Sequence, residues 1–222
     1  MKISAKQQLL VYVPPHPLVK HWISVMRSKH TPSPIFRSAA AELGRLLLYE
    51  AVREWLPTFE TQIETPLNMM AEATFVDPNK PIKIVPVLRA GTVLLEASST
   101  LLPATETYHV GYVRDENTLQ PKCYLNKLPK SLQQDDLVLV SDTMLATGGT
   151  IMAVMTDLVE RGADPSNVRI LSAVVAPPAL QKLNEKFPGL KVYTGIIDAE
   201  VDEHGFIIPG VGDAGDRSFG TC

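Results

Sequence analysis

Residues 138–150 read Val138-Leu139-Val140-Ser141-Asp142-Thr143-Met144-Leu145-Ala146-Thr147-Gly148-Gly149-Thr150. The stretch begins as an apolar strand, passes an acidic residue and a loop of small residues, and leads into a helical pattern that opens at Ile151. Because Gly148 and Gly149 have no side chains, backbone N–H groups can approach a ligand closely there, and the helix N-terminus adds its positive end. This order predicts an anion-binding loop at the end of a buried strand.

Asp142 restricts which anion this loop can bind. A carboxylate beside a phosphate repels it, unless the carboxylate binds sugar hydroxyls or a divalent cation that the ligand carries. Together these requirements describe a phosphorylated sugar. The stretch lacks both the Gly-x-x-x-x-Gly-Lys-Ser/Thr pattern of nucleoside triphosphatases and the Gly-x-Gly-x-x-Gly pattern of dinucleotide-binding proteins. A simpler interpretation, in which the glycines only turn the chain, Thr150 caps the helix and Asp142 is a surface acid, is disfavoured by the apolar strand and amphipathic helix on either side.

Strands alternate with helices along most of the chain. Helical spacing predicts a helix over residues 36–55, with a buried face made of Phe36, Ala40, Leu43, Leu47 and Ala51. Further helices are expected over residues 93–97, 151–161 and 179–187, and strands over residues 82–88, 108–113, 137–141, 168–175 and 191–197. This alternation predicts an α/β fold with a central parallel sheet flanked by helices, and ligands beyond the carboxyl ends of the strands.

Two stretches do not follow the alternation. Residues 114–122 are polar, and residues 205–222 are too glycine-rich for a helix yet too apolar for a disordered tail. Both are expected to be loops around the binding site, while their composition is also typical of ordinary surface connections.

Composition limits the protein class. A chain of 222 residues fits one domain over residues 1–222, and a net charge of −3 gives no basic field for nucleic acid. No run approaches the roughly 18 apolar residues of a membrane helix. Two cysteines make no disulfide framework, and five histidines show no metal-ligand spacing. We therefore expect no nucleic-acid or membrane partner and a cytoplasmic location, or the plastid stroma if the chain is a trimmed precursor.

Four motifs carry a resemblance to a known family: His16-Pro17-Leu18-Val19-Lys20-His21, Pro86-Val87-Leu88-Arg89-Ala90-Gly91, Asp142 to Gly149, and Pro209-Gly210-Val211-Gly212-Asp213-Ala214-Gly215-Asp216-Arg217. In this order they resemble the uracil phosphoribosyltransferases, a branch of the type I phosphoribosyltransferases, and the resemblance runs nearly from end to end. Thr143 stands where the family usually has proline, and Ser141 stands where other phosphoribosyltransferases often have a first acid.

The resemblance implies a type I phosphoribosyltransferase-like fold, with a small hood formed by about residues 1–35 and 200–222. It implies a pentosyltransferase that moves the 5-phosphoribosyl group of 5-phosphoribosyl-1-pyrophosphate (PRPP) to N1 of uracil, giving uridine monophosphate (UMP) and pyrophosphate in pyrimidine salvage. Mg²⁺ is the implied cofactor, and a homo-oligomer, dimer or tetramer, is the implied assembly. Some relatives are activated by GTP, which leaves a GTP effector open.

The same resemblance assigns the site. The catalytic residues are Asp142, Arg89 and Arg114. PRPP is bound by Arg89, Arg114, Asp213 and the loop Asp142, Thr143, Met144, Leu145, Ala146, Thr147, Gly148, Gly149 and Thr150. Uracil is bound by Ile207, Gly212, Asp213 and Ala214. Mg²⁺ is held mainly by PRPP and water, with Asp213 contacting it through water.

Residue chemistry agrees with these assignments. The planar guanidinium of arginine donates paired hydrogen bonds to phosphate and stays charged. Uracil is neutral, so backbone groups can recognise its carbonyl oxygens and imide N–H, and cytosine would leave buried groups unpaired. Two alternatives compete: a phosphoribosyltransferase for another base, such as a purine, and an RNA-binding regulator built on the same fold. The C-terminal motif resembles the uracil branch, and the scattered lysines and arginines form no basic cluster.

Overall fold

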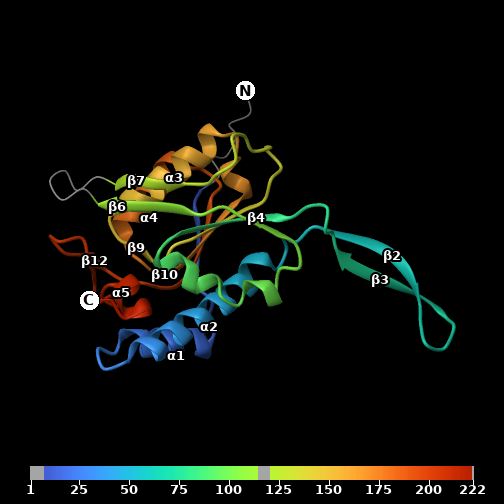
Figure 1. Cartoon of the computed structure of the whole chain (residues 1–222), viewed down its shortest axis with the longest axis horizontal. Helices are drawn as coiled ribbons and strands as arrows, with labels where there is room; N and C mark the ends of the chain where they lie inside the picture. The colour runs from blue at the N-terminus through green and yellow to red at the C-terminus, as the bar shows by residue number, and fades with distance from the viewer. Residues whose placement is uncertain (1–7, 115–120, 222) are drawn as a thin grey trace.

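The computed structural model describes residues 8–114 and 121–221, and a largely parallel sheet lies at its centre (Figure 1). The strands follow the spatial order β1 (Leu10–Tyr12), β11 (Lys191–Ile197), β10 (Val168–Val175), β8 (Val138–Ser141), β4 (Ile82–Leu88), β6 (Val110–Arg114) and β7 (Pro121–Asn126). Two short strands, β5 (Thr105–Thr107) and β9 (Met144–Leu145), pair with β4 and β10. Neighbouring strands in this sheet run parallel, except β6 and β7.

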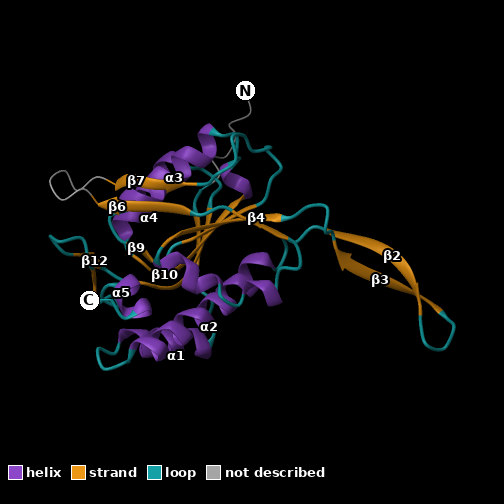
Figure 2. Ribbon diagram, in the orientation of Figure 1, coloured by secondary structure: helices purple, strands orange, loops and turns teal. Residues whose placement is uncertain are grey.

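Helices cover both faces of the sheet (Figure 2). One face packs against α1 (Pro17–Arg27), α2 (Ser33–Val52) and α5 (Ala214–Phe219), and the other packs against α3 (Gly149–Glu160) and α4 (Pro177–Lys186). Three short 3-10 helices, η1 (Ala90–Leu95), η2 (Ser98–Thr100) and η3 (Pro165–Asn167), connect these elements. Every residue of β8 and β10 is buried, which explains their largely apolar sequences; the polar exceptions are Ser141, Arg169 and Ser172. The expected α/β fold class is confirmed.

The predicted face of α2 is confirmed, because Phe36, Ala40, Leu43, Leu47 and Ala51 are all fully buried. The predicted strands over residues 82–88, 168–175 and 191–197 match β4, β10 and β11. The segment over residues 93–97 is not an α-helix: residues 93–95 end η1 and residues 96–97 form a turn, so the segment is too short for many i to i+4 hydrogen bonds.

Two loop predictions are partly wrong. Pro121 and Lys122 begin β7, an edge strand whose mostly exposed side chains leave no apolar alternation in the sequence. Residues 115–120 lie outside the described residues. The glycine-rich end contains α5, which Asp213 caps by accepting a hydrogen bond from the Asp216 N–H at 2.9 Å. Cys222 also lies outside the described residues.

A two-stranded arm, which the sequence analysis did not identify, projects from the body of the protein (Figure 1). It consists of β2 (Thr58–Glu64) and β3 (Met70–Val76), paired antiparallel. A smaller hairpin of β12 (Glu200–Val201) and β13 (Ile207–Ile208) precedes α5. Within the described residues, no helix is both long and apolar enough to cross a membrane.

Candidate functional site

The carboxyl ends of β4, β6 and β8 meet at one edge of the sheet, where parallel α/β proteins bind ligands. A cavity of about 480 Å³ lies there. Its lining joins residues that are far apart in the sequence: Arg89 follows β4, Asp142 follows β8, and Asp213 and Ala214 begin α5. The structure therefore brings the predicted strand-end residues and part of the C-terminal motif around one space.

The loops after β4 and β8 touch through Gly91. A Cβ atom at Gly91 would lie 2.1 Å from the Ser141 carbonyl oxygen, so only glycine permits this approach. The buried Ser141 hydroxyl donates to the Gly91 carbonyl oxygen at 2.8 Å. This contact holds the Arg89 loop beside Asp142, a role for Ser141 that the sequence analysis did not predict.

Asp142 is a partly buried carboxylic acid. Burial raises the pKa of its carboxyl to about 7, while hydrogen bonds from the backbone N–H groups of Met144 and Thr143 lower it. The carboxyl is therefore partly protonated near neutral pH, and a nearby cation would favour its charged form. Its own N–H donates to the Leu171 carbonyl oxygen at 3.0 Å, which fixes the loop to β10.

The loop after Asp142 forms an open cradle at the start of α3. Asp142, Met144 to Thr150 and Ile151 line this hollow, whereas Thr143 faces the larger cavity. Gly148 adopts φ 84°, and no side chain caps the helix. Among the described residues, no acceptor takes the backbone N–H of Thr147, Gly148, Gly149 or Thr150. These free donors, together with the helix dipole, suit a phosphate group.

Arg89 is held by the C-terminal segment. It donates to Asp216 at 2.9 Å and to the Thr221 hydroxyl at 3.0 Å, and it lies over the Phe219 ring. The Thr221 hydroxyl and Arg89 keep the pKa of Asp216 below its ordinary value. Asp216 and Thr221 are thus neighbours of the site that the sequence analysis missed, although Asp216 lies within the quoted C-terminal motif.

Arg217 ties the C-terminal segment to the N-terminal helices. It donates to the carbonyl oxygens of Met26, Ser28 and Val211, and its guanidinium lies 4.3 Å from the centre of the Phe36 ring. Of the four residues predicted to bind uracil, Asp213 and Ala214 line the 480 Å³ cavity. Ile207 and Gly212 do not line it, because Ile207 is buried in the core and Gly212 turns the chain just before Asp213.

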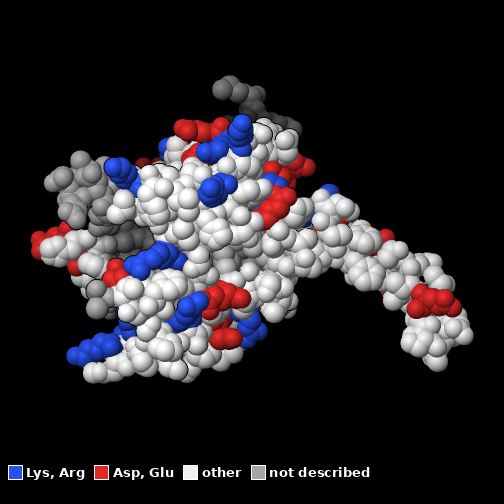
Figure 3. All heavy atoms as spheres, in the orientation of Figure 1, with Lys and Arg blue, Asp and Glu red and all other residues white. Residues whose placement is uncertain are grey.

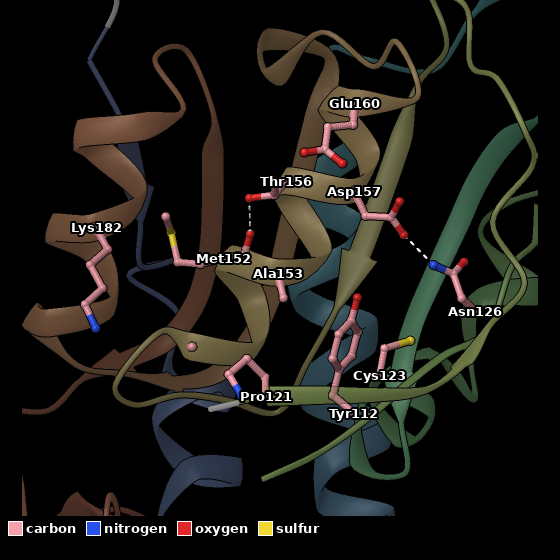
Figure 4. Close-up of a pocket in the computed structure, with 11 residues that line it drawn as sticks. Tyr112, Pro121, Cys123, Asn126, Met152, Ala153, Thr156, Asp157, Glu160 and Lys182 are labelled. Carbon is pink, nitrogen blue, oxygen red and sulfur yellow. Dashed lines mark hydrogen bonds between the residues drawn. The ribbon is translucent and has the colours of Figure 1, made fainter. Parts of the chain in front are cut away.

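Aromatic residues complete the cavity wall. Tyr112 and Tyr124, from the paired strands β6 and β7, both line it, and no local sequence signal marks them as site residues. Tyr112 also lines a neighbouring open groove of about 740 Å³ between β7, α3 and α4 (Figure 4). Arg114 is the last residue of β6, and its side chain lies outside the described part of the structure.

Two carboxylates in the cavity, Asp142 and Asp213, offer the oxygen ligands that Mg²⁺ prefers. Within the described residues, no group of three or more His, Cys, Asp or Glu side chains forms a metal-binding cluster. A magnesium ion that arrived with a phosphorylated ligand would therefore find individual carboxylates rather than a dedicated cage.

Comparison with known proteins agrees with this geometry. The family model described as uracil phosphoribosyltransferase matches residues 13–221. A Nostoc sp. protein of that name is 59% identical over 214 residues, covering 96% of this chain and 99% of the relative. A Nicotiana tabacum protein of the same name is 58% identical over 220 residues, covering 99% and 98%. A solved structure from Aquifex aeolicus has a TM-score of 0.85 at 31% identity, covering 95% of this chain and 98% of that one. The chain belongs to the uracil phosphoribosyltransferase family.

Proposed function

We propose that this protein transfers the 5-phosphoribosyl group of PRPP to N1 of uracil, giving UMP and pyrophosphate for pyrimidine salvage. The cavity carries the proposal, because it joins Arg89, Asp142 and Asp213 beside a loop with free N–H donors. Nearly full-length identity with proteins named for this activity supports the same reaction.

PRPP binds along the edge of the sheet. The loop from Asp142 to Thr150 holds the 5-phosphate, and the Asp142 carboxylate accepts hydrogen bonds from the ribose hydroxyls. Arg89 and Arg114 bind the pyrophosphate and neutralise it as it leaves. Departure of pyrophosphate builds positive charge at the anomeric carbon, so catalysis comes from orienting N1 of uracil and stabilising the leaving group, with no dedicated general base.

Magnesium fits the available donors. The PRPP phosphates and water would supply most of its ligands, and Asp213 would contact it through water. When bound, the ion supplies positive charge to the leaving pyrophosphate.

The base is proposed to lie under a hood made by about residues 1–35 and 200–222 of a single domain, of which residues 1–7 and 222 lie outside the described residues. Two sets of contacts support this arrangement. Arg217 donates to the carbonyl oxygens of residues 26 and 28. Asp198, just before the C-terminal part of the hood, pairs with Arg27 at 2.6 Å and accepts a hydrogen bond from the Gly210 N–H at 2.9 Å. Asp213 and Ala214, which line the cavity, contact uracil, and we assign backbone groups of Ile207 and Gly212, which do not line it, to the edge of the base. Backbone recognition of a neutral base excludes cytosine, whose amino group would face a donor.

The activity test follows uracil conversion by ultraviolet absorbance with PRPP and Mg²⁺. Cytosine, hypoxanthine, adenine and orotate are the parallel substrates, and each assay is repeated with GTP, which we leave as a candidate effector. Turnover of uracil alone supports the proposal. Turnover of a different base would overturn the assignment of the C-terminal segment, while PRPP binding without turnover would favour the RNA-binding regulator.

The arm formed by β2 and β3 supports a homo-oligomer, a dimer or a tetramer. It exposes large apolar side chains at residues Phe59, Ile63, Leu67, Met69, Met70 and Phe75. Exposed apolar patches mark protein interaction sites, and the face in Figure 3 shows few charges along the arm. Light scattering after gel filtration measures the molar mass of the assembly in solution. If the tip of the arm makes the contact between subunits, a Leu67→Ser/Met69→Ser variant should have a lower molar mass than the unchanged protein. An unchanged molar mass would contradict a contact through the tip.

The proposed partners are the substrates, the products and further copies of this chain, with no nucleic acid and no membrane. On the face in Figure 3, Lys and Arg are interspersed with Asp and Glu.

The proposed location is the cytoplasm, or the plastid stroma if the chain is a trimmed precursor. The Arabidopsis thaliana relative, 58% identical over 219 residues, is named chloroplastic. Fractionation of the source cells followed by immunodetection distinguishes the two compartments.

A further inference from the structure

Lys182 of α4 donates a hydrogen bond to the backbone of the phosphate loop. This residue lies on α4, and its Nζ donates to the Thr147 carbonyl oxygen at 2.8 Å. Figure 4 shows its side chain extending from α4 toward the loop at the start of α3. Lys182 lines the 740 Å³ groove and not the cradle, and Gly149 is the described residue that lines both, so Lys182 contacts the loop from the groove.

Because the peptide unit is planar, this contact also fixes the direction of the Gly148 N–H. The Thr147 carbonyl and the Gly148 N–H belong to one trans peptide unit, so they point in opposite directions. An ammonium group that holds the carbonyl on the groove side therefore turns the Gly148 N–H toward the cradle. The positive charge also polarises the peptide and strengthens its N–H as a donor.

The rest of α4 packs against the same point of the loop. A Cβ atom at Gly148 would lie 2.9 Å from the Ala179 Cα and 3.6 Å from the Lys182 Cδ. The loop thus rests on the first turns of α4, and Lys182 adds the one side-chain hydrogen bond that α4 gives it within the described residues.

We propose that Lys182 is a positioning residue for substrate binding: it orients the Thr147–Gly148 peptide so that the Gly148 N–H binds the 5-phosphate of the phosphoribosyl substrate. This inference rests on the proposed function of the loop. It assigns the residue to affinity for the phosphorylated sugar and not to the chemical step or to recognition of the base.

Lys186 provides a matched control one turn later on α4. Its Nζ donates to the Thr156 hydroxyl at 2.8 Å, so it joins α4 to the middle of α3 and makes no contact with the loop. The experiment compares Lys182→Met, Lys182→Arg and Lys186→Met with the unchanged protein. It measures kcat, KM for PRPP and KM for uracil, and it measures binding of ribose 5-phosphate by calorimetry.

Lys182→Met is expected to raise KM for PRPP and Kd for ribose 5-phosphate about two- to tenfold, the effect of one hydrogen bond. The kcat and the KM for uracil should stay unchanged. Lys182→Arg should restore most of the affinity, and Lys186→Met should change neither constant. Equal effects of the two Met variants, or a fall in kcat without a change in PRPP affinity, would overturn the inference.

A further variant separates this inference from the role of the loop itself. Thr150→Val alters the cradle directly. If Thr150→Val weakens ribose 5-phosphate binding and Lys182→Met does not, the loop assignment holds and the role of Lys182 is wrong. If both leave that binding unchanged, the phosphate lies elsewhere and the proposed site fails with the inference.

Discussion

The phosphate loop and the C-terminal segment, two walls of the same site, are built in different ways. The loop over residues 142–150 is one continuous stretch, and its donors belong to neighbouring residues at a helix start. The segment over residues 205–221 works through distant contacts: Asp216 reaches Arg89, and Arg217 reaches residues 26 and 28. The donors of the first wall belong to one local stretch, which β10 and α4 hold in place, whereas distant residues assemble the second wall.

The difference teaches where each kind of mutation should act. Changes in the loop should act mainly on PRPP binding, because the loop's donors face the ligand, and should lower stability only where a new side chain meets α4, as at Gly148. Changes in the contacts of the C-terminal segment should lower the stability of the fold and weaken binding of the base, because those contacts hold the segment in place.

Among changes in the phosphate loop, Asp142→Asn should reduce activity with PRPP the most. The amide keeps one acceptor oxygen for the ribose hydroxyls but loses the second acceptor and the negative charge, and we expect kcat/KM for PRPP to fall about 100-fold or more. Steady-state kinetics with saturating uracil measure it. Asp164→Asn is the control, since Asp164 caps η3 before the start of β10, away from the cavity, and should change kcat/KM less than about twofold. Comparable effects at both positions would place the ribose elsewhere.

Gly148→Ala tests the shape of the loop. Its positive φ and the 2.9 Å approach of Ala179 both exclude a Cβ atom, so the loop must shift. We expect KM for PRPP to rise about tenfold with a stability loss of about 1–2 kcal/mol. Gly189→Ala has the same φ of 84° at a turn outside the site, and it should lower stability without changing KM. A tenfold rise in KM for Gly189→Ala as well would show that general strain, not loop shape, sets the affinity.

Arg217→Met tests the C-terminal wall. The change removes three hydrogen bonds to carbonyl oxygens and the contact with Phe36, and we expect a loss of about 2 kcal/mol of unfolding free energy, or about 4–8 °C in Tm. KM for uracil should rise more than KM for PRPP. Arg45→Met removes only an exposed pair with Glu42 and should change Tm by less than about 2 °C. An equal rise in both KM values for Arg217→Met would mean that the C-terminal segment supports binding of both substrates and not mainly of uracil.

The smallest effect concerns pH. Since the pKa of the Asp142 carboxyl is about 7 in the folded protein and 3.8 ordinarily, the folded state holds the extra proton between these values. Stability should therefore fall as pH rises from about 4 to 7, and the Asp142→Asn variant should avoid that loss because its amide does not titrate. We expect the Tm advantage of Asp142→Asn to be about 2–4 °C larger at pH 8 than at pH 5. Calorimetry at both pH values checks this, and an advantage independent of pH would contradict the role of burial.

Much of the fold could be predicted because its signals are local. The buried face of α2 repeats at helical spacing, and the strands β4, β10 and β11 are apolar runs bounded by helical or turn sequences. The arm of β2 and β3 was missed because its mostly exposed strands lack the alternation of buried and exposed residues that marks a half-buried strand. The edge strand β7 was missed for the same reason.

The sequence by itself determined the position and the donors of the phosphate loop, since a strand end, two glycines and a helix start are adjacent in the chain and together place free N–H groups at a helix N-terminus. Tertiary structure alone decided three features of the site: the Gly91–Ser141 contact, the pairing of Arg89 with Asp216, and the approach of Lys182 to the Thr147 carbonyl. Each joins residues 35 or more positions apart. No local pattern records such contacts, because the packing of helices on the sheet sets the distance between their partners.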